Sequence, residues 1–200
     1  HGALELALVG DFTDDQAIAL VAKTLGALPP READDRPYAD NRTRSFTPDR
    51  GIRTVYHTGQ PNQAAVDFEW PTRDNKDFVE DRKLEMLERV ADAELTDSLR
   101  ENLGQTYSPQ VSAEQSRFYP GWGTFEVEAS VDTSQVEATR KAIIETIAKL
   151  RSAPIDDDVM LRARKPLLEL YDNALKTNEG WMSLVDHAQS KPERIDRFLK

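Results

Sequence analysis

The polar and apolar residues of this chain alternate with the period of a β-strand in three places. Residues 64–70 place Ala, Val, Phe and Trp on one face and Ala, Asp and Glu on the other, which predicts a half-buried strand. Residues 107–116 and 122–131 alternate in the same way on either side of the turn residues Tyr119-Pro120-Gly121, and they predict a β-hairpin. Because Pro109 cannot donate a backbone hydrogen bond, its strand is predicted to lie at a sheet edge.

Two shorter apolar runs are also predicted to be strands. Residues 4–9, LELALV, are closed by a Gly-Asp pair and are predicted to form an interior strand. Residues 52–57, IRTVYH, are followed by a turn sequence, and we expect them to pair antiparallel with residues 64–70.

Helical spacing of the apolar residues predicts five helices, over about residues 14–25, 77–103, 134–151, 156–177 and from 181 onward. Thr13 or Asp14 can cap the first of them. Pro166 is expected to kink or split the fourth. The second carries a main apolar stripe and a weaker one beside it, which predicts burial on more than one side. The main stripe is Leu84, Leu87, Ala91, Leu95 and Leu99, and the weaker one is Val79, Met86, Val90 and Ala93.

Residues 31–51 interrupt this pattern with prolines, Asp, Arg and Asn, and they read as a surface linker. The linker divides the chain into residues 1–47, a small β–α unit with linker, and residues 50–200, a larger domain with strands and helices. The predicted order of elements places the fold in the α+β class.

Charge and composition exclude several functions. The net charge of −10 and the pI near 4.9 argue against nucleic acid or an anionic membrane surface as a partner. The chain has no cysteine, so disulfides and thiolate chemistry are excluded, and zinc would need His or carboxylate ligands. No apolar run approaches the length of a transmembrane helix, and no signal-peptide pattern opens the sequence.

The search for catalytic patterns leaves one pair of residues. No zinc-peptidase motif, nucleophile elbow, phosphate loop or dinucleotide fingerprint occurs, and His57 and His187 read as ordinary, partly exposed histidines. Arg100 lies near the end of the long helix, and Tyr107 starts the next extended segment. A guanidinium and a phenol can both donate hydrogen bonds to a carbonyl oxygen or its oxyanion. The alternative is an exposed arginine and a core tyrosine with no shared role.

Several stretches, taken in order, resemble the pitrilysin/insulinase-type zinc metallopeptidases. They are ALVGDF (7–12), LGALP (25–29), SLRENLGQTYSP (98–109), FYPGWGTFEVEASVD (118–132) and KPLLELYDNALKTNEGWMSLV (165–185). The resemblance implies two-layer domains, each with helices packed on one face of a mixed or antiparallel sheet. It also implies a peptidase of two homologous halves, of which this chain resembles the C-terminal, metal-free one.

The same resemblance assigns roles and partners. Arg100 and Tyr107 match an arginine and a tyrosine, seven residues apart, that reach toward the peptide substrate and serve both binding and catalysis. Zinc is expected in the N-terminal half, in the same protein or in a partner subunit, and no cofactor in this chain. Residues 1–47 would end one homologous domain and residues 50–200 would form most of the next, truncated at its end.

The expectation for this chain alone is no peptidase activity, and exported relatives suggest the periplasm. Two alternatives remain open: a non-catalytic scaffold or partner subunit of the same fold, and a free-standing α+β domain.

Overall fold

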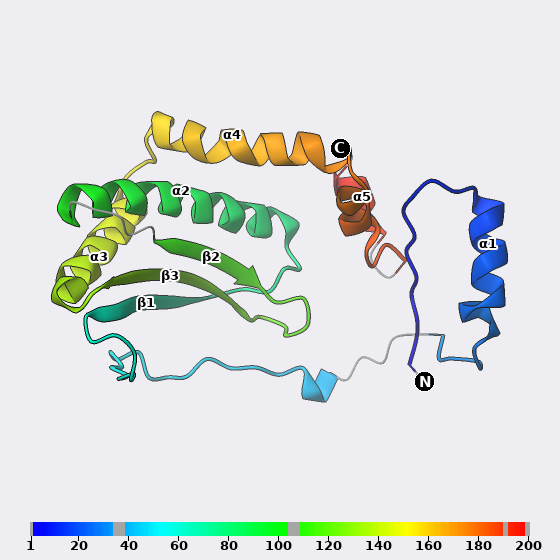
Figure 1. Cartoon of the computed structure of the whole chain (residues 1–200), viewed down its shortest axis with the longest axis horizontal. Helices are drawn as coiled ribbons and strands as arrows, with labels where there is room; N and C mark the ends of the chain where they lie inside the picture. Colours follow the sequence, from blue (N-terminus) through cyan, green and yellow to red (C-terminus); the bar gives the residue numbers. More distant parts are fainter. Residues whose placement is uncertain (1, 34–38, 104–108, 190–191, 199–200) are drawn as a thin grey trace. The chain divides into compact units, whose positions relative to one another are not determined.

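A computed structural model describes residues 2–33, 39–103, 109–189 and 192–198 of the chain. The chain forms two compact units: residues 39–166, and residues 1–38 together with 167–200 (Figure 1). These units reflect contacts within the chain and do not test the predicted division into residues 1–47 and 50–200, which stays a prediction.

The unit of residues 39–166 is built on a three-stranded antiparallel sheet with the strand order β1-β3-β2. Its strands are β1 (Gln63–Thr72), β2 (Gln110–Gln115) and β3 (Gly123–Asp132). Its helices are α2 (Phe78–Leu103), α3 (Val136–Ser152) and the first part of α4 (Asp157–Ala174). The α+β prediction, the β2–β3 hairpin and the edge position of the strand after Pro109 are therefore confirmed.

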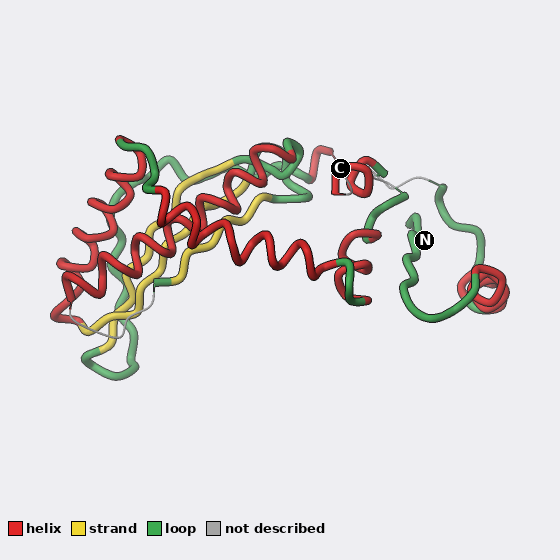
Figure 2. The backbone as a smooth tube through the Cα atoms, turned by 90° about the horizontal axis from the view of Figure 1, so that it is seen from above, coloured by secondary structure: helices red, strands yellow, loops and turns green. Residues whose placement is uncertain are grey.

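The helices α2 and α3 cover one face of this sheet, and the view from above shows the strands running beneath them (Figures 1 and 2). The inward-facing residues are those that the alternation predicted, because side chains of a strand alternate between its faces. The buried core consists of Val66, Phe125, Val127, Ala129 and Val131 of the sheet, Ala91, Leu95 and Leu99 of α2, and Ala142 and Ile143 of α3.

The two stripes of α2 are buried against different partners, as predicted. The main stripe packs on the sheet, whereas Val90 of the weaker stripe is fully buried against Val159 and Ala163 of α4. The helix α2 is thus held between the sheet on one side and α4 on the other.

The described residues of the second unit include the helices α1 (Asp14–Lys23), α5 (Asn178–Val185) and α6 (Glu193–Phe198), the short 3-10 helix η1 (Leu25–Ala27) and the end of α4. Thr13 caps α1 in a capping box, in which its hydroxyl accepts from the N–H of Gln16 and the Gln16 side chain accepts from the N–H of Thr13. The carboxylate of Glu5 accepts a hydrogen bond from the N–H of Gln189, at 2.7 Å, and so joins the two ends of the chain within this unit.

Two local predictions were wrong. Residues 4–9 and 52–57 are not strands; β1 pairs with β3 instead of with residues 52–57, where Tyr56 is 91% exposed. An apolar run becomes a strand only where a neighbouring strand completes its hydrogen bonds, and no described strand pairs with either run. The helix α4 runs through Pro166 without being split there, and the predicted kink at this proline stays a prediction.

Candidate functional site

Arg100 lies in the last turn of α2 with its side chain exposed. Leu99, immediately before it, is buried in the core and fixes the helix end on the sheet. A cation at this place also interacts favourably with the negative end of the helix dipole. Tyr107 lies outside the described residues, so the predicted convergence of Arg100 and Tyr107 stays a prediction.

A groove of about 590 Å³ opens in the same unit between α2, the start of β2 and α4. Its charged side chains are Glu88, Arg89 and Asp92 from α2 and Arg162 from α4. Residues 109–112, at the start of β2, form its opposite wall. Arg100 is not among the lining residues.

Two carboxylates lie one helical turn apart in this groove. The half-buried Glu88 accepts a hydrogen bond of 3.2 Å from the backbone N–H of Ala113 on β2. Burial raises the pKa of Glu88, although this hydrogen bond and the charge of Arg89 partly oppose the rise. Burial likewise raises the pKa of Asp92, with Arg89 again opposing it. Both groups lie where a positive charge would stabilise their ionised forms.

Arg89 lies between these carboxylates in sequence and is among the residues that line the groove. Its Nε atom is buried and has no hydrogen-bond partner among the described residues. Buried polar atoms in folded proteins are rarely left unpaired.

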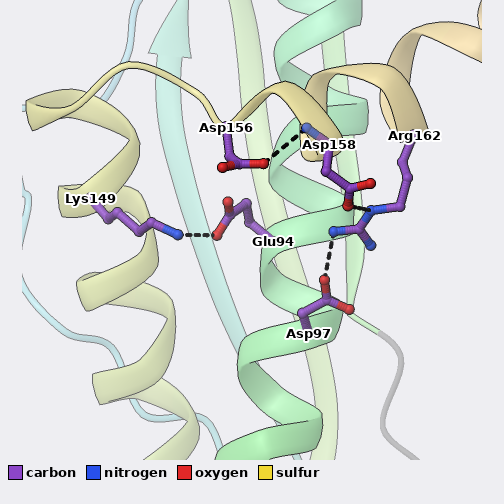
Figure 3. A network of polar contacts seen from close by, with 6 residues as sticks. All are labelled: Glu94, Asp97, Lys149, Asp156, Asp158 and Arg162. Atoms are coloured by element: carbon purple, nitrogen blue, oxygen red, sulfur yellow. Dashed lines mark hydrogen bonds and ion pairs between the residues drawn. The ribbon is translucent and has the colours of Figure 1, made fainter.

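Ion pairs join α2 to α4 and to α3 (Figure 3). Arg162 of α4 contacts Asp97 of α2 at 2.8 Å and Asp158 at 3.0 Å, and its pKa is raised mainly by the bond to Asp97. Lys149 of α3 contacts Glu94 of α2 at 2.8 Å. These partly exposed pairs contribute little stability each, but they hold α3 and α4 in place along α2.

In the described part of the chain, no group of three or more His, Asp or Glu side chains is arranged to hold a metal ion. The ring of His57 bridges a turn instead: Nδ1 accepts from the N–H of Gly59 at 2.9 Å, and Nε2 lies 3.0 Å from the carbonyl of Gln63. Nδ1 of His187 lies 3.9 Å from a carboxylate oxygen of Glu5, and its Nε2 lies 3.7 Å from a carboxylate oxygen of Asp186. Because these residues do not fit a zinc site, no catalytic step through zinc is assigned to this chain.

Comparison with protein families matches residues 2–167 to the peptidase M16 inactive domain. The chain belongs to the M16 peptidase family. Its resemblance to the C-terminal half of pitrilysin-type peptidases is thereby confirmed.

Comparison with solved structures finds 23 matching chains. One is the periplasmic protease PqqL from Escherichia coli, with a TM-score of 0.59 and 14% sequence identity. The match covers 94% of this chain and 22% of PqqL, so this M16 chain spans about a fifth of the length of that protein. This likeness shows the fold. No curated protein matches the chain. Among the described helices, none has the length and apolarity needed to cross a membrane.

The sequence analysis missed the groove, although its residues carry a signal. Glu88 and Asp92 are four residues apart, and this spacing places two carboxylates on one side of the helix. Spacing alone does not distinguish a solvated face from a groove wall. The decisive fact, that β2 and α4 lie against this side of α2, is set by tertiary packing.

Proposed function

We propose that this M16 domain is the C-terminal, metal-free part of a zinc endopeptidase and that Arg100 and Tyr107 serve its active site. The observation that carries the proposal is the family match to the inactive domain over residues 2–167. The exposed position of Arg100 at the end of a helix fixed by Leu99 supports it, because a guanidinium there is accessible to a substrate.

In this proposal, the zinc-bearing N-terminal half belongs to the same protein or to a partner subunit. Zinc supplies Lewis-acid activation of the peptide bond when that half is present. Arg100 and Tyr107 orient the peptide and donate hydrogen bonds to the carbonyl oxygen as it gains negative charge. The substrate is a peptide, and the location is the periplasm, as in PqqL.

The test uses the complete protein with its zinc-bearing half. Substituting Arg100→Ala or Tyr107→Phe should lower kcat by about 100-fold or more if either donor stabilises the oxyanion. Zinc content, measured by atomic absorption, should stay unchanged in both variants. Arg151→Ala is the matched control, because Arg151 is likewise an exposed arginine in the last turn of a helix, α3, and it should leave turnover unchanged.

Unchanged turnover in both variants would remove the pair from the mechanism. A complete protein without zinc and without peptidase activity would instead favour the scaffold function. The 200-residue chain alone is expected to retain no stoichiometric zinc after dialysis and to cleave no peptide.

A further inference from the structure

The imidazole of His57 fastens the turn that leads the linker into β1. Its Nδ1 accepts a hydrogen bond of 2.9 Å from the N–H of Gly59, and its Nε2 lies 3.0 Å from the carbonyl oxygen of Gln63, the first residue of β1. A backbone N–H can only donate a hydrogen bond, and a carbonyl oxygen can only accept one. The two contacts therefore require a neutral ring that carries its proton on Nε2.

Gly59 is fitted to this ring. A Cβ atom at position 59 would lie 2.6 Å from Nδ1 and 2.9 Å from Cε1 of His57. Both distances are shorter than the separation of about 3.5–4 Å at which non-bonded atoms attract each other. Glycine thus leaves the ring the room that it needs to reach the N–H of residue 59.

The contact with Gln63 covers part of the open edge of β1. The strand β1 has a described partner, β3, on one side only. Because the N–H of Thr133 donates to the carbonyl of Asn62 and successive residues alternate sides, the N–H and C=O of Gln63 face away from β3. The N–H of Gln63 donates to the carbonyl of Gln60, and its carbonyl accepts from His57. The turn thus satisfies the first outward-facing residue of this edge.

The same linker contains a second turn of this kind that is built on a carboxylate. Oδ1 of Asp49 accepts a hydrogen bond of 2.9 Å from the N–H of Gly51, two residues further on, as His57 does from Gly59. This bond and the neighbouring Arg53 hold the pKa of Asp49 below its ordinary value of 3.8. Asp49 therefore keeps its acceptor between about pH 8 and 5, the range in which histidine side chains ordinarily take up a proton.

The other charged groups around the turn at residues 57–63 do not titrate in this range. Asp132 of β3 lies opposite Gln63, and hydrogen bonds from Ser134 hold the pKa of Asp132 below its ordinary value, so it stays ionised. The 3-10 helix Thr133–Gln135 that follows has no charged residue. Arg53 precedes the turn and pairs with Asp49. In the described part of the chain, no ion pair involves His57.

We propose that His57 is a proton-sensitive fastener of the linker, which holds the turn at residues 57–63 while its ring is neutral and releases Gly59 when its ring is protonated. A proton on Nδ1 removes the acceptor of the Gly59 N–H and sets two donors against each other. The Nε2–H keeps its acceptor, so the carbonyl of Gln63 stays covered. The ring then holds the turn by one bond instead of two, and residues 52–58 gain freedom.

The other end of the linker is fastened by contacts that do not depend on pH in this range. The guanidinium carbon of Arg44 lies 3.8 Å from the centroid of the Trp122 ring. The ring of Phe46 stacks on the same indole, with the ring centroids 5.7 Å apart. Arginine stays charged at all these pH values, and the aromatic rings do not titrate. Protonation is therefore expected to release one end of the linker only.

An NMR titration of the nitrogen-15-labelled chain from about pH 8 to 5 tests the proposal. The Cε1–H signal of His57 reports protonation of the ring, and the protection of the Gly59 amide against hydrogen exchange reports the fastener. This protection, taken relative to an unstructured chain at the same pH, should fall about threefold as the ring is protonated. The Gly51 amide is the internal control and should keep its protection. A ring that is protonated without loss of protection at Gly59 would overturn the proposal.

Two variants assign the effect to the ring of His57. In His57→Asn, a carboxamide oxygen that does not titrate can accept from Gly59 as Asp49 accepts from Gly51, so the protection of Gly59 should stay high throughout. In His57→Phe, the acceptor is absent and the protection should stay low throughout. A pH-dependent fall in the asparagine variant, equal to that of the wild type, would trace the effect to another group and overturn the proposal.

Nitrogen-15 relaxation measures the consequence for the linker. The order parameters of residues 52–58 should fall as the ring is protonated, whereas those of residues 42–47 should not change. Equal changes at both ends would mean a general loosening of the linker and would contradict a release at His57. Arg100 and Tyr107 take no part in this titration. Failure here therefore leaves the proposed peptidase role untouched, and the reverse also holds.

Discussion

The two faces of the three-stranded sheet differ in polarity and in burial. The inner face is apolar and buried beneath α2 and α3. The outer face carries six carboxylates: Asp67, Glu69, Glu114, Glu126, Glu128 and, at the end of β3, Asp132. The register sets Asp67 directly opposite Glu128, and Glu69 directly opposite Glu126. Like charges directly opposite each other destabilise a sheet.

This difference shows that the sheet is stabilised from one side only. Burial raises the pKa of Glu126, and the charges of Asp67 and Glu69 raise it further. Burial also raises the pKa of Asp67, with Glu128 and Glu69 adding to the effect. The inner face must therefore supply enough stability to offset the repulsion on the outer one.

Removing a large side chain from the inner face should have the largest effect. Phe125 is 6% exposed and packs in the core, so Phe125→Ala should lower the free energy of unfolding by about 3–5 kcal/mol. Urea unfolding followed by circular dichroism measures the change. The control is Glu126→Gln, one residue further along the strand on the opposite face, which should not destabilise the chain. A loss below about 1 kcal/mol for Phe125→Ala would mean that the inner face is not the source of stability.

Reversing one charge on the outer face should stabilise the sheet by a smaller amount. Glu126→Lys places a cation opposite Glu69 and near Asp67. The free energy of unfolding should rise by about 0.5–1 kcal/mol at low salt, because an attractive cross-strand pair replaces a repulsive one. The gain should shrink in about 1 M NaCl, which screens surface charges. A gain in the free energy of unfolding that is the same at low and high salt would point to a cause other than charge.

The sequence predicted the elements that depend on local pattern. The alternation of residues 64–70 and 122–131 identified the inner faces of β1 and β3, and the two stripes of α2 identified its two buried sides. These predictions held because a period of two or 3.6 residues directly records which side of an element is buried.

Features that depend on strand register or on the elements packed against a segment could not be predicted from the sequence. Residues 64–70 show that Asp67 faces outward, but only the pairing of β1 with β3 sets it opposite Glu128. Residues 52–57 have the composition of a strand yet lie exposed, because strand formation requires a neighbour that composition does not name. The groove beside Glu88 could not be predicted for a similar reason, because it forms only where β2 and α4 lie against α2. For the predicted site, the family resemblance supplied the roles of Arg100 and Tyr107; the structure describes the position of Arg100.

The pH dependence of stability gives the subtlest test of the difference between the faces. Asp67 and Glu126 have folded-state pKa values raised above their ordinary values of 3.8 and 4.5. Over the range between the ordinary and the raised value, the folded protein binds more protons than the unfolded one. Their destabilising effect is therefore full above the raised values and is relieved as the pH falls through them.

The wild-type chain should thus gain stability, relative to the double variant Asp67→Asn and Glu126→Gln, as the pH is lowered from about 7 toward 4.5. Taking the difference between the two proteins removes the contributions of the carboxylates that do not interact with Asp67 or Glu126. Urea unfolding at a series of pH values measures it. Parallel stability curves across this range would show that the outer face carries no repulsion for protonation to relieve, and that the register places these carboxylates together without cost.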